Sequence, residues 1–407
     1  MGYAMADWTD LFDARLAMTP PVADEQLADI PAKRGVLLLT GPDDAPVVMV
    51  TAADMRSRAR SRLASPAEEQ ASPAAKTRIT KTPDLRQITQ AILYKRCESF
   101  FETELQFLEI ARQIWPGRYE KLLAWKQPWF VYIDLDEPYP HLAKKPHRFF
   151  CENLSAQACS RRWAIGPFAG RRDADKFIEA LQDTFDLCRS VKCLRNAPNG
   201  PRCAYAEINR CLSPADGTIS MDDYRQVLAW ACKFAAGQRE GLARKLRSEM
   251  SQASEELQFE RASACKTRLD RLAFFEGERF RQVGLADFWP RPEACEKDER
   301  YKKFRKILIQ PGAGKAERRV FLATLSEIIY AGPVHYPAKV EQLEVALKAM
   351  TSLGARIETP SQASGLGLGL ILRTLRASPA RRGLVVDWQE NLNADKLAEM
   401  MNREIGK

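Results

Sequence analysis

The apolar residues of the chain follow two patterns, and each pattern predicts a different kind of element. Short apolar runs such as GVLLLT at 35–40 and AILYKR at 91–96 are typical of buried β-strands. Between residues 98 and 115, Phe101, Leu105 and Leu108 recur at spacings of four and three, which predicts an amphipathic helix. Because both patterns recur along the chain, we expect a multidomain α+β fold.

The same patterns place further elements. Residues 220–282 are almost wholly helical by this criterion, and Ser220 followed by Asp223 predicts the N-terminal cap of that region. Its apolar seam has spacings of four, three and four, at Leu246, Met250, Ala253 and Leu257. The remaining expectations are strands at 46–51, 129–134, 304–310 and 319–330 and helices at 173–185, 337–353 and 393–404.

The length of 407 residues is enough for about two to four domains. Residues 65–77 and 285–300 contain small and polar residues or prolines typical of loops and linkers. We expect a leader at 1–30, a small α/β domain at 31–130, strands and a cysteine-rich segment at 131–217, a helical region at 218–284 and an α/β module at 285–407.

Composition narrows the partner class only slightly. The chain has 62 Lys and Arg against 53 Asp and Glu, a net charge of +9, which is compatible with an anionic partner without identifying one. No apolar run approaches the ~18 residues of a membrane span. The first residues lack the basic and then apolar layout of a signal peptide. We therefore expect a cytoplasmic protein with no membrane partner.

The cysteines are unevenly distributed. Four of the ten lie within 24 residues, at Cys188, Cys193, Cys203 and Cys211, and the other six are scattered and read as buried, inert thiols. Four thiolates are what an iron–sulfur cluster or a structural zinc ion requires. Their spacings of five, ten and eight are unusual, so a thiol group held only by packing is the alternative.

The helical text MSQASEELQFERASACKTRL at 250–269 resembles the UVR motif, and the order of segments from about 31 to 285 resembles UvrC and its shorter relative Cho, incision proteins of bacterial nucleotide excision repair. The resemblance implies pairing with UvrB. An amphipathic helix that packs on its own domain is the alternative. The residues implied to bind UvrB are Met250, Leu257, Phe259, Glu260 and Ala262.

The cysteine segment is also similar to the UvrC pattern, in which it is thought to hold a 4Fe–4S cluster. Cys203, Cys211 and the following Leu-Ser-Pro match that pattern, but the last cysteine of the family falls on Ala215. The resemblance implies that Cys188 and Cys193 would complete the ligand set.

Residues 31–130 resemble a GIY-YIG nuclease domain, which hydrolyses phosphodiesters around one Mg²⁺ ion. The two tyrosine positions of that family hold Leu37 and Met49 here, while Arg58 and Glu109 remain in place. Leucine and methionine cannot accept a proton, and loss of one general acid–base group typically costs ~10²–10⁴ in rate. The resemblance therefore implies a degenerate nuclease in which Glu109 is the remaining candidate Mg²⁺ ligand.

Three functions are open at this point. The first is a UvrC/Cho-like adaptor that binds DNA and UvrB with a silent nuclease domain. The second is an atypical Mg²⁺-dependent endonuclease, and the third is a stand-alone nucleic-acid-binding or regulatory protein.

UvrC also contains an RNase H-like nuclease module after the UVR motif, and the acidic motif of that module is not visible in 286–407. In the same region, GLGLGL at 365–370 predicts a helix-opening turn. The candidate DNA contacts are Arg56, Arg58, Arg60 and Arg62.

Overall fold

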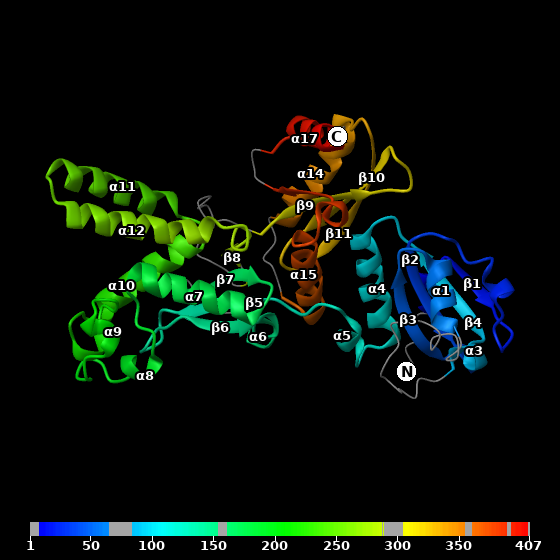
Figure 1. The fold of residues 1–407 in the computed structure, drawn as a ribbon, viewed down its shortest axis with the longest axis horizontal. Coiled ribbons are helices and arrows are strands. Elements are labelled where there is room, and N and C mark those ends of the chain that lie inside the picture. Colours follow the sequence, from blue (N-terminus) through cyan, green and yellow to red (C-terminus); the bar gives the residue numbers. More distant parts are fainter. Residues whose placement is uncertain are drawn as a thin grey trace, which may run out of the picture.

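The computed structural model describes residues 8–64, 84–153, 161–286, 288, 304–354, 360–388 and 392–405. Within these ranges the chain forms three four-stranded antiparallel sheets, each with its own helices, so the predicted α+β multidomain class is confirmed. Figure 1 shows the N-terminal part at one end, the middle part with a projecting helical hairpin at the other, and the C-terminal module between them. None of the helices in these ranges has the length and apolarity that a bilayer crossing requires.

The first sheet has the strand order β1-β4-β2-β3. Helix α1 covers one face of this sheet and helix α4 covers the other, because alternate residues of β2 pack against different helices: Leu37 lies in the α1 cluster and Leu38 in the α4 cluster. Residues 14–17 of the predicted leader form the edge strand β1. The elements are η1 (Trp8–Leu11), β1 (Ala14–Ala17), η2 (Asp24–Leu27), β2 (Gly35–Thr40), η3 (Pro42–Asp44), β3 (Pro46–Ala52), α1 (Met55–Leu63), α3 (Leu85–Ile88), β4 (Ala91–Arg96), α4 (Phe100–Ile114) and α5 (Tyr119–Leu122).

The middle sheet has the order β6-β5-β7-β8, and its core contains packed aromatic rings from helices α7, α10 and α12. Phe177 of α7 contacts Phe275 of α12 at 5.2 Å between ring centroids, and Phe275 contacts Phe234 of α10 at 5.0 Å. The elements are β5 (Trp129–Asp134), β6 (Ala143–Pro146), α6 (His147–Glu152), β7 (Arg162–Phe168), α7 (Arg171–Phe185), α8 (Val191–Leu194), α9 (Ala204–Glu207), η4 (Pro214–Asp216), α10 (Met221–Ala235) and β8 (Gly284–Leu285).

Two long helices, α11 (Glu240–Glu255) and α12 (Phe259–Glu276), form an antiparallel hairpin that extends away from the sheets (Figure 1). Ser220 caps α10 as predicted, because its hydroxyl accepts from the Asp223 amide at 3.1 Å. The predicted single helical region is therefore three helices with a short connection before the hairpin and a tight turn at its end.

The C-terminal sheet has the order β11-β10-β9-β12, with α14 and α17 on one face and α15 on the other. The single strand predicted at 319–330 is wrong, because a turn held by the Thr324 hydroxyl separates β10 from β11. GLGLGL lies inside α15 and not at a helix-opening turn. The elements are β9 (Lys306–Pro311), β10 (Glu317–Ala323), β11 (Ile328–His335), α14 (Val340–Gly354), α15 (Gln362–Leu375), α16 (Pro379–Arg382), β12 (Leu384–Asp387) and α17 (Ala394–Ile405).

Candidate functional site

The two positions predicted to correspond to the nuclease tyrosines are buried. Leu37 has no exposed surface and packs against α1, whereas Met49 is 7% exposed and packs on the α4 side of the sheet. Both side chains are part of the hydrophobic core, so neither could hold a water molecule or take up a proton. The structure therefore uses these two positions for packing.

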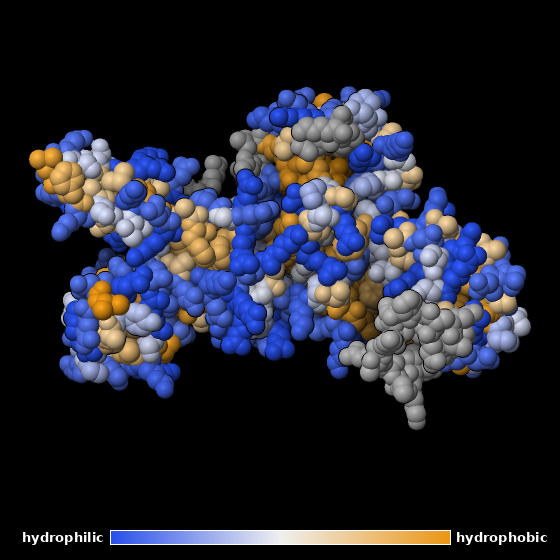
Figure 2. Space-filling model, in the orientation of Figure 1, coloured by the Kyte–Doolittle hydropathy of each residue, from blue (hydrophilic) through white to orange (hydrophobic). Residues whose placement is uncertain are grey.

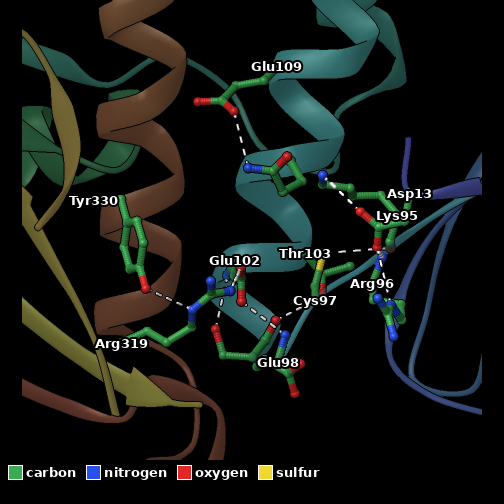
Figure 3. A network of polar contacts seen from close by, with 12 residues as sticks. Asp13, Lys95, Arg96, Cys97, Glu98, Glu102, Thr103, Glu109, Arg319 and Tyr330 are labelled. Carbon is green, nitrogen blue, oxygen red and sulfur yellow. Dashed lines mark hydrogen bonds and ion pairs between the residues drawn. The ribbon is translucent and has the colours of Figure 1, made fainter. Parts of the chain in front are cut away.

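The structure does not bring Arg58 and Glu109 together. Arg58 lies on α1 and Glu109 on α4, and the first sheet separates these two helices. Glu109 is exposed and accepts a hydrogen bond from Gln106 Nε2 at 3.2 Å (Figure 3). Partial loss of hydration beside the surrounding protein raises the pKa of the Glu109 carboxyl, and the positive charge of Arg112 opposes this effect. A shared phosphate and metal site would require these side chains on one face of the sheet.

The four arginines of α1 also divide between two sides of the helix. Residues two apart in an α-helix point ~200° apart, so Arg56 and Arg60 flank the buried face on one side and Arg58 and Arg62 on the other. Arg56 Nε donates to the carbonyl of Ile30 at 2.8 Å, while Arg60 and Arg62 are exposed. The predicted DNA contacts therefore do not form one continuous basic stripe.

A polar network at the start of α4 joins the N-terminal domain to the C-terminal module (Figure 3). The carboxylate of Glu102 pairs with Arg319 and accepts from the amide of Glu98 at 2.9 Å. Arg319 also donates to the Tyr330 hydroxyl at 3.2 Å. This contact was not predicted from the sequence, because Glu102 and Arg319 are 217 residues apart and no local pattern links them.

The cysteine segment forms a thiol cluster around Cys211. The Cys188 thiol hydrogen-bonds that of Cys211, which also interacts with Cys203, while Cys193 acts on Cys188 electrostatically. Cys211 Sγ accepts from the Ser213 amide at 3.4 Å. The hydrogen bond from Cys188 lowers the pKa of Cys211 to about 6, and the same contact together with burial raises the pKa of Cys188.

The thiol cluster has the soft donors that an iron–sulfur cluster or zinc requires, and Ala215 at the missing ligand position is buried. However, no group of three or more His, Cys, Asp or Glu side chains in the described ranges is arranged to hold a metal ion. Binding of an iron–sulfur cluster or a zinc ion at these thiols stays a prediction.

The end of the α11–α12 hairpin exposes large apolar side chains. Leu257 is 72% exposed and Phe259 is 67% exposed, and Figure 2 shows hydrophobic atoms at the tip of the projecting hairpin. Leu257 occupies the turn with a left-handed φ of 57°. Since isolated exposed apolar residues are ordinary but a pair at the tip of a protruding element is a docking feature, the tip is a candidate interface.

The other residues implied to bind UvrB lie on both sides of this tip. Met250 and Ala262 are half-buried, and Glu260 is exposed. The two helices are held to each other and to the middle domain by different residues, the buried Leu246, Ala253, Cys265 and Leu272. The apolar seam predicted from residue spacing therefore divides between a packed base and an exposed tip.

Two segments of the chain match known protein families. Residues 139–234 match the family model of the UvrC/Cho excinuclease middle domain, and residues 240–273 match that of the UvrB/UvrC motif. These two segments are UvrC-like. The thiol cluster lies within the UvrC-like middle domain, and the exposed tip lies within the UVR motif. The expected resemblance is confirmed for these segments.

Individual relatives show the same likeness over about a third of this chain. The UvrABC system protein C of Saccharopolyspora erythraea is 32% identical over 141 residues, which cover 34% of this chain and 20% of the relative. That of Novosphingobium aromaticivorans is 31% identical over 150 residues, 37% of this chain and 21% of the relative. The chain thus spans about a fifth of the length of these curated relatives. No solved structure matches this chain.

Proposed function

We propose that this protein acts in nucleotide excision repair as a UvrC/Cho-like adaptor that binds DNA and UvrB and does not cleave DNA with its N-terminal domain. The observation that carries the proposal is the projecting UVR hairpin with its exposed apolar tip. A hairpin whose apolar end is left exposed by the described part of the chain is suited to pair with the matching hairpin of another protein.

The silent nuclease domain is supported by the packing of the first sheet. Leu37 and Met49 fill the core where the family has tyrosines, and the sheet separates Arg58 from Glu109. A one-metal nuclease needs a water-activating group, a phosphate contact and a metal ligand on one surface. The N-terminal domain offers these only in part and on different faces.

The partner can be tested by capture of purified UvrB on the immobilised full chain. Leu257→Asp places a charge in the apolar contact, so we expect UvrB retention to fall at least about tenfold. Val345→Asp on α14 is the matched control, because Val345 is 64% exposed and lies on a different helix, and it should retain UvrB as the wild type does. Equal retention by both variants would show that the tip does not bind UvrB.

The catalytic part can be tested by incision of a damaged duplex with UvrB and Mg²⁺ present. We expect no cleavage above background. Cleavage that disappears in Glu109→Ala would instead establish an atypical Mg²⁺-dependent nuclease. DNA binding with no UvrB capture at all would favour the stand-alone nucleic-acid-binding protein.

The proposal uses no metal at the cysteines. Anaerobic purification, an absorbance scan and iron and zinc analysis separately test the prediction that these cysteines hold an iron–sulfur cluster or a zinc ion. Stoichiometric iron or zinc that is lost in Cys211→Ser would establish the ligand role, and protein with neither metal would reject it.

A further inference from the structure

A large basic cleft lies between the UvrC-like middle domain and the C-terminal module. Its volume is about 990 Å³, and its walls come from the end of β7 and residues 278–282 after α12 on one side and from β9, α15, α16 and β12 on the other. Six basic and two acidic side chains line it: Arg279, Arg281, Lys306, Arg318, Arg376 and Arg382 with Glu278 and Asp387. The charge of this surface is thus strongly positive.

Two of the arginines share one carboxylate across the domain boundary. Asp173 at the start of α7 pairs with Arg376 at 2.7 Å and with Arg279 at 3.5 Å. Asp173 is only 13% exposed, whereas the two arginine side chains are 48% and 52% exposed. One half-buried carboxylate therefore positions two exposed guanidinium groups and leaves a net positive charge at the cleft.

On the C-terminal wall of the cleft, Arg382 also has a carboxylate partner, but the pair is looser. The closest carboxylate to Arg382 among the described ion pairs is Glu278, at 3.9 Å, and Glu278 is 90% exposed. In contrast, Lys306 is 2% exposed and pairs with Asp387, so it contributes to the floor and not to the mouth. Arg279, Arg376 and Arg382 are consequently partly exposed cations that an anion in the cleft could reach.

The lining indicates which anion fits. None of the described residues that line the cleft is aromatic, so it offers no platform on which bases could stack. Arginine forks spaced along a groove match successive phosphates of a polynucleotide, and such contacts bind without regard to base sequence. Arg279 and Arg376 converge on Asp173, but Arg382 and Lys306 pair with other carboxylates, so the positive charge extends past the single point that a compact anion would occupy.

The geometry points to this cleft as the site where the protein binds the phosphodiester backbone of a nucleic acid. The inference rests on the proposed DNA-binding function and names its surface. It replaces the α1 arginines as the principal contact, because those lie on two sides of one short helix, whereas the cleft gathers its arginines from two domains.

Fluorescence anisotropy of a labelled single strand and of the corresponding duplex, titrated with salt, tests the cleft on the full chain. Arg279→Gln/Arg376→Gln/Arg382→Gln should weaken binding about tenfold and lower the slope of log K against log salt by about 2–3. Arg382→Gln alone keeps both Asp173 pairs intact and should lower the slope by about one. The control, Lys348→Gln/Lys396→Gln, removes two exposed lysines of α14 and α17 that do not line the cleft, and it should bind as the wild type does.

The outcomes separate the inference from the function on which it rests. Loss with the single strand, the duplex or both supports the cleft and assigns the form of nucleic acid. Wild-type binding that Arg382→Gln and the folded triple variant both retain overturns the cleft and leaves DNA binding standing. A wild type that binds neither probe overturns both. Cleft variants that lose only binding of a polyglutamate peptide would show that the cleft takes an acidic protein instead.

Discussion

His147 shows how a single residue can be committed to the core although its side chain is polar. It has no exposed surface, its ring lies 6.0 Å from Phe130 and 5.8 Å from Phe288, and its Nε2 has no hydrogen-bond partner among the residues that the structure describes. The Cys151 thiol at 3.7 Å from Nδ1 is its polar neighbour. Burial lowers the pKa of His147 to about 4 from an ordinary value of 6.5.

This shift makes the free energy of unfolding depend on pH. Between pH 6.5 and about 4 the unfolded chain binds a proton at this position and the folded chain does not, so stability falls as the pH falls. We expect the contribution to be about 1–2 kcal/mol between pH 7 and pH 5. Urea unfolding at several pH values should show a smaller pH dependence for His147→Gln. An identical slope in both proteins would contradict it.

At the level of elements, the contacts of α15 explain why this helix contains the glycine run GLGLGL. A Cβ at Gly369 would lie 2.3 Å from the Lys126 carbonyl, and one at Gly365 would lie 2.5 Å from His147 Nδ1. The Trp125 indole also donates to the Leu366 carbonyl at 2.8 Å. The helix therefore needs glycine so that its backbone can approach the preceding domains closely.

Alanine substitutions in α15 test this argument. Gly369→Ala forces a backbone carbonyl to move, so we expect a loss of about 2–3 kcal/mol in the free energy of unfolding. Gly367→Ala is the matched control, because its Cβ would meet only the flexible end of Ile328 at 3.3 Å. The control should be neutral or gain up to ~1 kcal/mol from helix propensity. Comparable losses in urea titrations would show that the close approach does not matter.

Elements were easier to predict from the sequence than the site. The strand at 35–40 and the helix near 98–115 followed from local apolar spacing, which the fold preserves. The glycine run was predicted to be a helix-opening turn, and that prediction was wrong, because only the contacts with Trp125 and Lys126 reveal its role inside α15. Likewise, the spacing of the α1 arginines predicted one basic surface, but the helix divides these arginines between two sides.

At the scale of the whole molecule, α4 lies between two folding units. Its inner face packs on the first sheet, and its N-terminal end is bound by the C-terminal module through the Glu102–Arg319 pair and through Arg373 and Arg381 over the Phe100 ring. The side chain of Glu102 is 10% exposed. The N-terminal domain and the C-terminal module should therefore unfold together.

Arg319→Ala tests this connection. It leaves the Glu102 carboxylate buried without its guanidinium, and breaking a buried pair in this way costs about 3–5 kcal/mol, so we expect about 2–3 kcal/mol for this partly exposed arginine. Glu102→Gln/Arg319→Met should recover part of the loss because no charge remains unpaired. The control is Lys348→Ala, which breaks an exposed pair with Glu344 and should cost less than ~0.5 kcal/mol. If Arg319→Ala costs no more than the control does, the contact contributes little. If it instead splits thermal unfolding into two transitions, α4 is the element that makes the two units cooperative.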